Sequence, residues 1–179
     1  MIAVLSAALL FASGCGMMDN SKKVDRSADV KDVDMARQEA KALSSEIFDA
    51  IGLKGQTSAT WPGVLRCEED SRHLYKIHHP WSVWGVPEED MERSMEQLKE
   101  ALPKRGWKLV SYGRDKSLAQ NLELVADSAK SKFSVNITFM DKRRSAQYDS
   151  PKASKESGIL VTVVSACFRV PDGKVVDQY

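Results

Sequence analysis

The segment 133–139 most constrains the fold of this chain, because it alternates between apolar and polar side chains. Its apolar residues are Phe133, Val135, Ile137 and Phe139, and its polar residues are Ser134, Asn136 and Thr138. Successive side chains of a strand point to opposite faces of a sheet, so the pattern predicts a strand with one face on the core. Such a strand needs a second layer to cover its apolar face.

Two predicted helices can supply that layer. Apolar residues recur at three- and four-residue spacing from Asp32 onward, which predicts the first helix. These residues are Ala36, Ala40, Leu43, Ile47 and Ile51. Asp32 or Asp34 can cap the start of this helix, and Gly52 or Gly55 can end it. The second helix is predicted from Pro87 onward, because acidic residues at its start favour the helix dipole. Its apolar stripe consists of Met91, Met95, Leu98 and Leu102.

The remaining strand signals complete the fold prediction. Further strands are expected at 65–67, from 73 to about 77, and at 107–112, 122–126 and 159–170. Pro80 interrupts the second of these or places it at a sheet edge, and the last is apolar enough to lie centrally. We expect an α+β fold, a two-layer sandwich with a mainly antiparallel sheet of four to five strands and two helices on one face. A polar loop is expected at 141–157.

The N-terminal residues 1–14 are small and apolar, and no charged residue appears before Asp19. Such a run predicts an export signal, because about 20 apolar residues are needed to cross a membrane. Ala12, Ser13 and Gly14 precede Cys15 and resemble the lipobox of bacterial lipoproteins. The resemblance implies that Cys15 is lipidated. We therefore expect a signal peptide at 1–14, a lipidated flexible tether at 15–31 and a single α+β domain at 32–179.

The other two cysteines, Cys67 and Cys167, form an even pair once Cys15 is assigned to the lipid. In an oxidising compartment such a pair is normally bridged. A disulfide across so long a loop stabilises the fold by about 4.7 kcal/mol in the chain-entropy picture. The alternative is two buried, unpaired thiols.

Composition and motifs argue against several classes of function. The net charge of +1 gives no electrostatic footprint for nucleic acid. No phosphate-binding loop and no serine-hydrolase elbow is present in the sequence, so we expect a protein that is not an enzyme and needs no cofactor. The less favoured alternative is a metal-dependent hydrolase, in which His73 and His79 would converge with nearby carboxylates. Otherwise the histidines are strand residues satisfied by hydrogen bonds.

Two groups of residues are candidate contacts for a partner. Trp81 and Trp84 form a binding surface or pack the corner between a strand and the second helix. They face opposite sides if this segment is extended. Arg143 and Arg144 lie in the polar loop, where they contact a partner or anionic head groups or are simply solvated.

Three segments of the folded part carry a further resemblance: HPWSVWGVP, LPKRGWKLVSYG and VTVVSACFRVP. They resemble small lipoproteins of actinomycetes, particularly the Streptomyces type, and more loosely the LppA-type lipoproteins of mycobacteria. The resemblance implies a location and no mechanism. We therefore predict a membrane-anchored, extracytoplasmic lipoprotein that acts as a binding module for an envelope protein or a cell-wall ligand. The alternative is an accessory structural subunit of an envelope complex.

Overall fold

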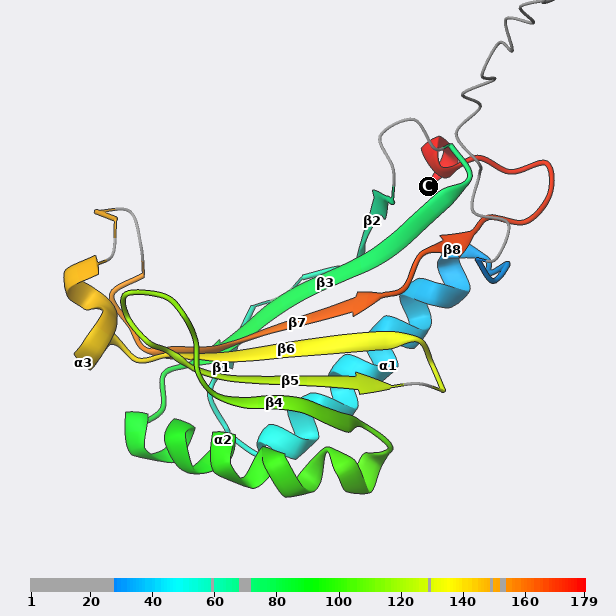
Figure 1. Cartoon of the computed structure of the whole chain (residues 1–179). Coiled ribbons are helices and arrows are strands. Elements are labelled where there is room, and N and C mark those ends of the chain that lie inside the picture. The colour runs from blue at the N-terminus through cyan, green and yellow to red at the C-terminus, as the bar shows by residue number, and fades with distance from the viewer. Residues whose placement is uncertain (1–27, 59, 68–71, 129, 149, 152–153) are drawn as a thin grey trace, which may run out of the picture.

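The computed structural model describes residues 28–179, except 59, 68–71, 129, 149 and 152–153 (Figure 1). The α-helices are α1 (Val33–Ile51), α2 (Glu88–Ala101) and α3 (Lys142–Ser145). Short 3-10 helices occupy η1 (Pro103–Arg105), η2 (Ala146–Tyr148) and η3 (Val176–Gln178). The strands are β1 (Gln56–Thr57), β2 (Gly63–Arg66), β3 (Leu74–Trp84), β4 (Lys108–Arg114), β5 (Leu122–Ser128), β6 (Phe133–Met140), β7 (Gly158–Ser165) and β8 (Phe168–Arg169).

All strands belong to one antiparallel sheet in the order β1-β3-β7-β6-β5-β4, with β2 and β8 also paired to β3. The predicted α+β class is confirmed, and β7 lies centrally as expected. The predicted strand count was too low, because the sheet has eight strands. Two of the added strands, β1 and β8, are only two residues long and carry no readable alternation.

Helices α1 and α2 lie on one side of the sheet and cover its apolar face (Figure 1). The alternation in β6 is confirmed, since Phe133, Val135, Ile137 and Phe139 are all buried. The α1 stripe is buried against β3 and β7. Asp32 caps this helix by accepting a hydrogen bond from the Asp34 N–H at 2.9 Å. Gly52 ends the helix in the left-handed conformation that glycine adopts without strain.

Strand β3 runs through Pro80, so the predicted interruption was wrong, whereas the alternative, a position at a sheet edge, agrees with the strand pairing. Its outer neighbours are β2, paired to residues 75–78, and β1, paired to residues 83–84. Pro80 lies between these two pairings, where no strand requires its missing N–H. Its carbonyl oxygen accepts a hydrogen bond from the Thr60 hydroxyl at 2.6 Å. A proline is therefore tolerated inside this long strand at a gap along its edge.

Two predictions in the C-terminal half need correction. The segment 141–157 is not a plain polar loop, because it contains α3 and η2, and Asp141 caps α3 by accepting from the Arg143 N–H. The predicted strand 159–170 is divided into β7 and β8 at Ala166 and Cys167. This break places Cys167 beside Cys67, which follows β2. Their Cα atoms lie 6.1 Å apart and the predicted disulfide is confirmed.

The expected signal peptide, Cys15 and most of the expected tether lie outside the described residues. The described end of that tether is attached to the domain: Val30 bridges to Arg169 in β8, and Tyr75 donates a hydrogen bond to the Lys31 carbonyl at 2.9 Å. The folded part of the chain thus begins before Asp32. Within the part of the chain that the structure describes, no helix has the length and apolar character needed to cross a membrane.

Candidate functional site

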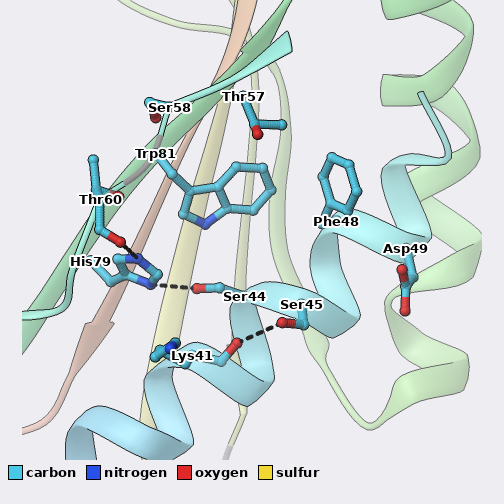
Figure 2. A pocket seen from close by; sticks show the side chains of 10 residues that line it. All are labelled: Lys41, Ser44, Ser45, Phe48, Asp49, Thr57, Ser58, Thr60, His79 and Trp81. Carbon is cyan, nitrogen blue, oxygen red and sulfur yellow. Dashed lines mark hydrogen bonds between the residues drawn. The ribbon is translucent and has the colours of Figure 1, made fainter. Parts of the chain in front are cut away.

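A cavity of about 390 Å³ lies between α1 and the edge of β3 where Pro80 leaves the sheet unpaired (Figure 2). One wall comes from successive turns of α1, formed by Lys41, Ser44, Ser45, Phe48 and Asp49. The other wall comes from the inward side chains of β3 and from residues that end or follow β1, namely His79, Trp81, Thr57, Ser58 and Thr60. We call this cavity the α1–β3 pocket.

The backbone holds β1 close to β3 at the end of this pocket. Ser58 donates its N–H to the Ser82 carbonyl at 3.1 Å, and the Ser82 N–H donates to the Ser58 hydroxyl at 2.9 Å. Gly55 permits the approach, because a Cβ at this position would lie 2.3 Å from the Trp84 carbonyl oxygen. The wall of the pocket therefore depends on a glycine and a serine rather than on a long strand.

Ser44 and His79 meet at the floor of the pocket, where their exposed fractions are 6% and 7%. The Ser44 Oγ and His79 Nδ1 atoms share a hydrogen bond at 2.8 Å, and His79 Nε2 lies 3.4 Å from the Thr60 carbonyl oxygen. A carbonyl oxygen only accepts, so the Thr60 contact favours the tautomer in which Nε2 carries the proton and Nδ1 accepts from the Ser44 hydroxyl. The pair ties α1 to β3.

Burial lowers the pKa of His79 below its ordinary value of 6.5, although the carbonyl groups of Thr60 and Ala40 partly oppose this effect. The imidazole is therefore neutral at pH 7. Ser44, His79 and Trp81 are the deepest polar groups of the pocket, and none of them carries a charge. This neutral interior differs from the pocket rim, where Lys41 and Asp49 are both exposed.

Trp81 supplies the least satisfied group in the pocket. Its exposed fraction is 7%, and its ring packs edge-on against Phe48 with the centroids 6.0 Å apart. Its indole Nε1 is buried and has no hydrogen-bond partner among the described residues. Figure 2 shows this edge of the ring directed toward Ser44. A buried donor without a partner costs about 1–3 kcal/mol. Because less than 1 Å² of this nitrogen is accessible, an acceptor in the pocket reaches it only if the Trp81 ring turns.

The rim of the pocket continues onto an exposed aromatic side chain. Lys41 Nζ lies 4.3 Å from the ring centroid of Trp61, which is 64% exposed. An exposed tryptophan beside a pocket is a typical feature of binding surfaces. The sequence interpretation did not single out Trp61, Phe48 or Lys41. The one available signal was Ser44, a polar residue on the apolar face of a predicted helix.

The two tryptophans singled out in the sequence do not form one site. Trp81 faces the helices and the α1–β3 pocket, whereas Trp84 lies on the opposite face of β3. There it lines a separate cavity of about 300 Å³ together with Met140 and Leu160. Strand alternation explains the separation, as residues three apart point to opposite faces. Gly85 then turns the chain toward α2 with a φ of 77°.

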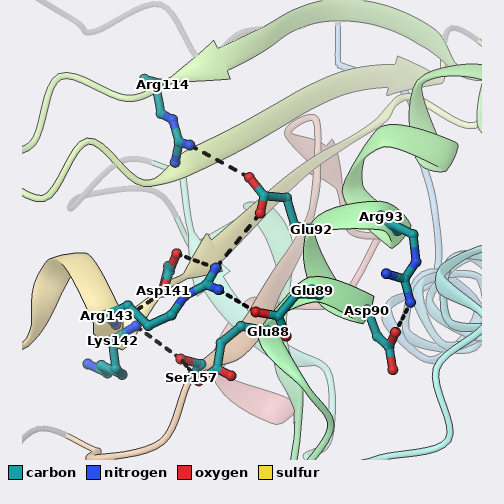
Figure 3. Close-up of polar contacts among 10 residues, drawn as sticks. All are labelled: Glu88, Glu89, Asp90, Glu92, Arg93, Arg114, Asp141, Lys142, Arg143 and Ser157. Atoms are coloured by element: carbon teal, nitrogen blue, oxygen red, sulfur yellow. Dashed lines mark hydrogen bonds and ion pairs between the residues drawn. The ribbon is translucent and has the colours of Figure 1, made fainter.

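Arg143 is engaged within the fold (Figure 3). Its guanidinium donates two hydrogen bonds to Asp141, both at 2.9 Å, and one to Glu89 in α2 at 2.8 Å. Ser157 extends this contact region: its hydroxyl donates to Glu88 at 3.0 Å and accepts from the Lys142 N–H at 3.0 Å. We call these five residues and Lys142 the α2–α3 clamp. Arg144 is exposed beside it.

His73 and His79 are not brought together. The His73 Nδ1 atom lies 3.2 Å from the Lys174 carbonyl oxygen, near the C-terminus, whereas His79 faces α1. Six residues of extended strand separate their backbones by about 20 Å. Over the described residues, no group of three or more histidine, cysteine, aspartate or glutamate side chains is placed to hold a metal ion.

Comparison with known proteins adds no family to this picture: no protein-family model, no curated protein and no solved structure matches the chain. The function is therefore inferred from the geometry of the α1–β3 pocket.

Proposed function

We propose that this chain is a lipid-anchored, extracytoplasmic binding module whose α1–β3 pocket holds a small ligand or one unit of a cell-wall ligand. The proposed anchor is Cys15, after a signal peptide at 1–14. The Cys67–Cys167 disulfide supports export, because such bonds persist in oxidising compartments. Mixed charges and an absence of phosphate-binding motifs support a partner other than nucleic acid.

The proposed binding function rests on the Trp81 indole N–H, which has no hydrogen-bond partner in the described part of the chain. Buried polar groups in folded proteins are hydrogen-bonded in the great majority of cases, so an exception needs an explanation. Here the exception lines a cavity whose walls combine two aromatic rings with several hydroxyl groups. Small-molecule sites usually combine aromatic or apolar walls with convergent polar groups. This pocket has the rings of Phe48 and Trp81 among mostly polar lining side chains.

Membrane fractionation tests the anchor. The Cys15→Ala protein should leave the membrane fraction, whereas the parent protein should stay there. If the Cys15→Ala protein remains in the membrane fraction, the proposed anchor is wrong.

Ligand-detected NMR tests the pocket. The Cys15→Ala protein is mixed with a panel of small sugars, amino acids and short peptides. Binders should lose their signal changes when Trp81 is replaced by Phe and keep them when Trp84 is replaced by Phe. Binding that responds to Trp84 alone, or no binding at all, would contradict the pocket assignment.

A further inference from the structure

The interior of the α1–β3 pocket restricts the charge of what it can hold. Its most buried polar side chains are those of Ser44, His79 and Trp81, each at least nine-tenths buried. None of them offers a counter-charge. A charged group moved into this space would lose its hydration without compensation, which is costly. The part of the ligand that enters the pocket must therefore be neutral.

The hydrogen-bonding groups of the pocket restrict the polarity of the ligand. The Trp81 Nε1–H requires an acceptor, and the hydroxyl groups of Ser45, Thr57 and Thr60 line the pocket nearer the surface. A hydroxyl group both donates and accepts, so it can satisfy the indole N–H and exchange hydrogen bonds with these side chains. A purely apolar ligand would leave the indole unpaired.

The aromatic side chains of the pocket restrict the shape of the ligand. The rings of Phe48 and Trp81 meet at an interplanar angle of 68° and form an apolar wall. A pyranose ring matches such a wall, because its C–H faces are apolar while its edge carries hydroxyl groups. The volume of about 390 Å³ lies at the lower end of the range for small-molecule sites. It suits one or two sugar rings.

We infer that the α1–β3 pocket binds a neutral saccharide unit, with the Trp81 ring turning so that its indole N–H, buried in the ligand-free pocket, donates to a sugar oxygen. The exposed Trp61 beside Lys41 extends this site at the surface, where a further unit of a glycan would stack. This inference rests on the proposed function and adds the class of ligand. A peptide with charged ends is the competing ligand. It is less suited because the charged side chains that line the pocket, Lys41 and Asp49, are exposed, and ion pairs with exposed side chains contribute little.

Calorimetric titration of the Cys15→Ala protein distinguishes the two classes. The probes are neutral oligosaccharides, such as the trimer of N-acetylglucosamine and maltotriose, and the zwitterionic peptide triglycine. At least one saccharide should bind. Trp81→Phe should weaken that binding about tenfold or more, the effect of losing one well-placed hydrogen bond, and Trp84→Phe should leave it unchanged. Asp49→Asn should change it less than threefold.

A second variant tests the site without changing a buried residue. Thr57→Val removes a hydroxyl at the exposed side of the pocket, away from the core, and should weaken saccharide binding two- to fivefold. If triglycine binds in a Trp81-dependent way and no saccharide does, the ligand class is wrong while the proposed pocket stands. If neither class binds, the inference and the pocket assignment both fail.

Discussion

The α1–β3 pocket and the α2–α3 clamp are both polar regions at a margin of the sheet, yet their polar groups are used differently. In the clamp, Arg143 is bonded to Asp141 and Glu89, so each charge faces its opposite (Figure 3). In the pocket, the Trp81 indole N–H has no partner among the residues that the structure describes, and the buried side chains are neutral (Figure 2). The difference separates a region that fastens one segment to another from a region that can receive a ligand.

The sequence pattern singled out a charged residue in one of these regions and no neutral residue of the pocket floor. Arg143 was a candidate contact for a partner because it lies in a basic stretch. In the structure its guanidinium joins the segment after β6 to the first turn of α2, and its contact with a partner stays a prediction. Ser44 lies in the apolar stripe of α1 and was not predicted as a site residue, yet it forms the pocket floor with His79. The charged side chain lies in the region that joins two segments, and the proposed binding region contains a neutral donor.

Of the changes considered, removing the disulfide should lower the free energy of unfolding most. The double variant Cys67→Ser and Cys167→Ser frees a loop closed across 100 residues, which should lower the free energy of unfolding by about 2–5 kcal/mol. Urea unfolding measures this loss. The bond lies away from both polar regions, so saccharide binding at low temperature should persist. An unchanged unfolding midpoint would show that the bond does not form.

Breaking the clamp should reduce stability without affecting the pocket. The Asp141→Ala variant removes a carboxylate that is 4% exposed, together with two hydrogen bonds to Arg143 and the cap of α3. We expect a loss of about 1–3 kcal/mol in the free energy of unfolding, measured by urea unfolding. Asp49→Asn, at the exposed rim of the pocket, is the matched control and should be neutral. Equal effects of the two variants would remove the distinction between the regions.

The two regions should also respond to acid in different pH windows. Burial lowers the pKa of His79 in the folded protein, so the unfolded chain takes up this proton more readily. The free energy of unfolding should therefore fall as the pH drops below about 6.5, until the folded pKa is reached. Hydrogen bonds from Arg143 lower the pKa of Asp141 below 3.8, so the stability due to the clamp is lost only below about that pH.

Urea unfolding at a series of pH values measures both windows. His79→Gln should remove the loss that begins near pH 6.5, and Asp141→Ala should remove the one that begins near pH 3.8. If His79→Gln leaves the first loss unaltered, the pocket histidine is not buried as described.

Altering the pocket should have the smallest effect on stability. Trp81→Phe keeps an aromatic ring and removes the unpaired donor, so the gain from losing a buried N–H offsets the loss of packing. The free energy of unfolding should change by less than about 1 kcal/mol, measured by urea unfolding, while saccharide binding weakens. A loss of several kcal/mol would show that Trp81 serves mainly as a core residue.

Local patterns predicted much of the fold. The alternation of 133–139 identified β6, and Asp32 and Gly52 marked the ends of α1. The sequence left two alternatives open for Pro80, because its tolerance depends on the gap between β1 and β2, which is a property of the assembled sheet. The α1–β3 pocket likewise depends on how α1 lies across β3. No local pattern states that Ser44 will meet His79, although a serine in an apolar stripe indicates a buried polar contact.

The Trp81 indole N–H itself gives the most direct test of the central claim. The chain has four tryptophans, so a ¹H–¹⁵N spectrum of the Cys15→Ala protein contains four indole signals, which single Trp→Phe variants assign. On addition of the binding saccharide, the Trp81 indole signal should move to lower field as it gains an acceptor, and the Trp84 signal should stay in place. A Trp81 signal that remains fixed at saturating ligand would contradict the account.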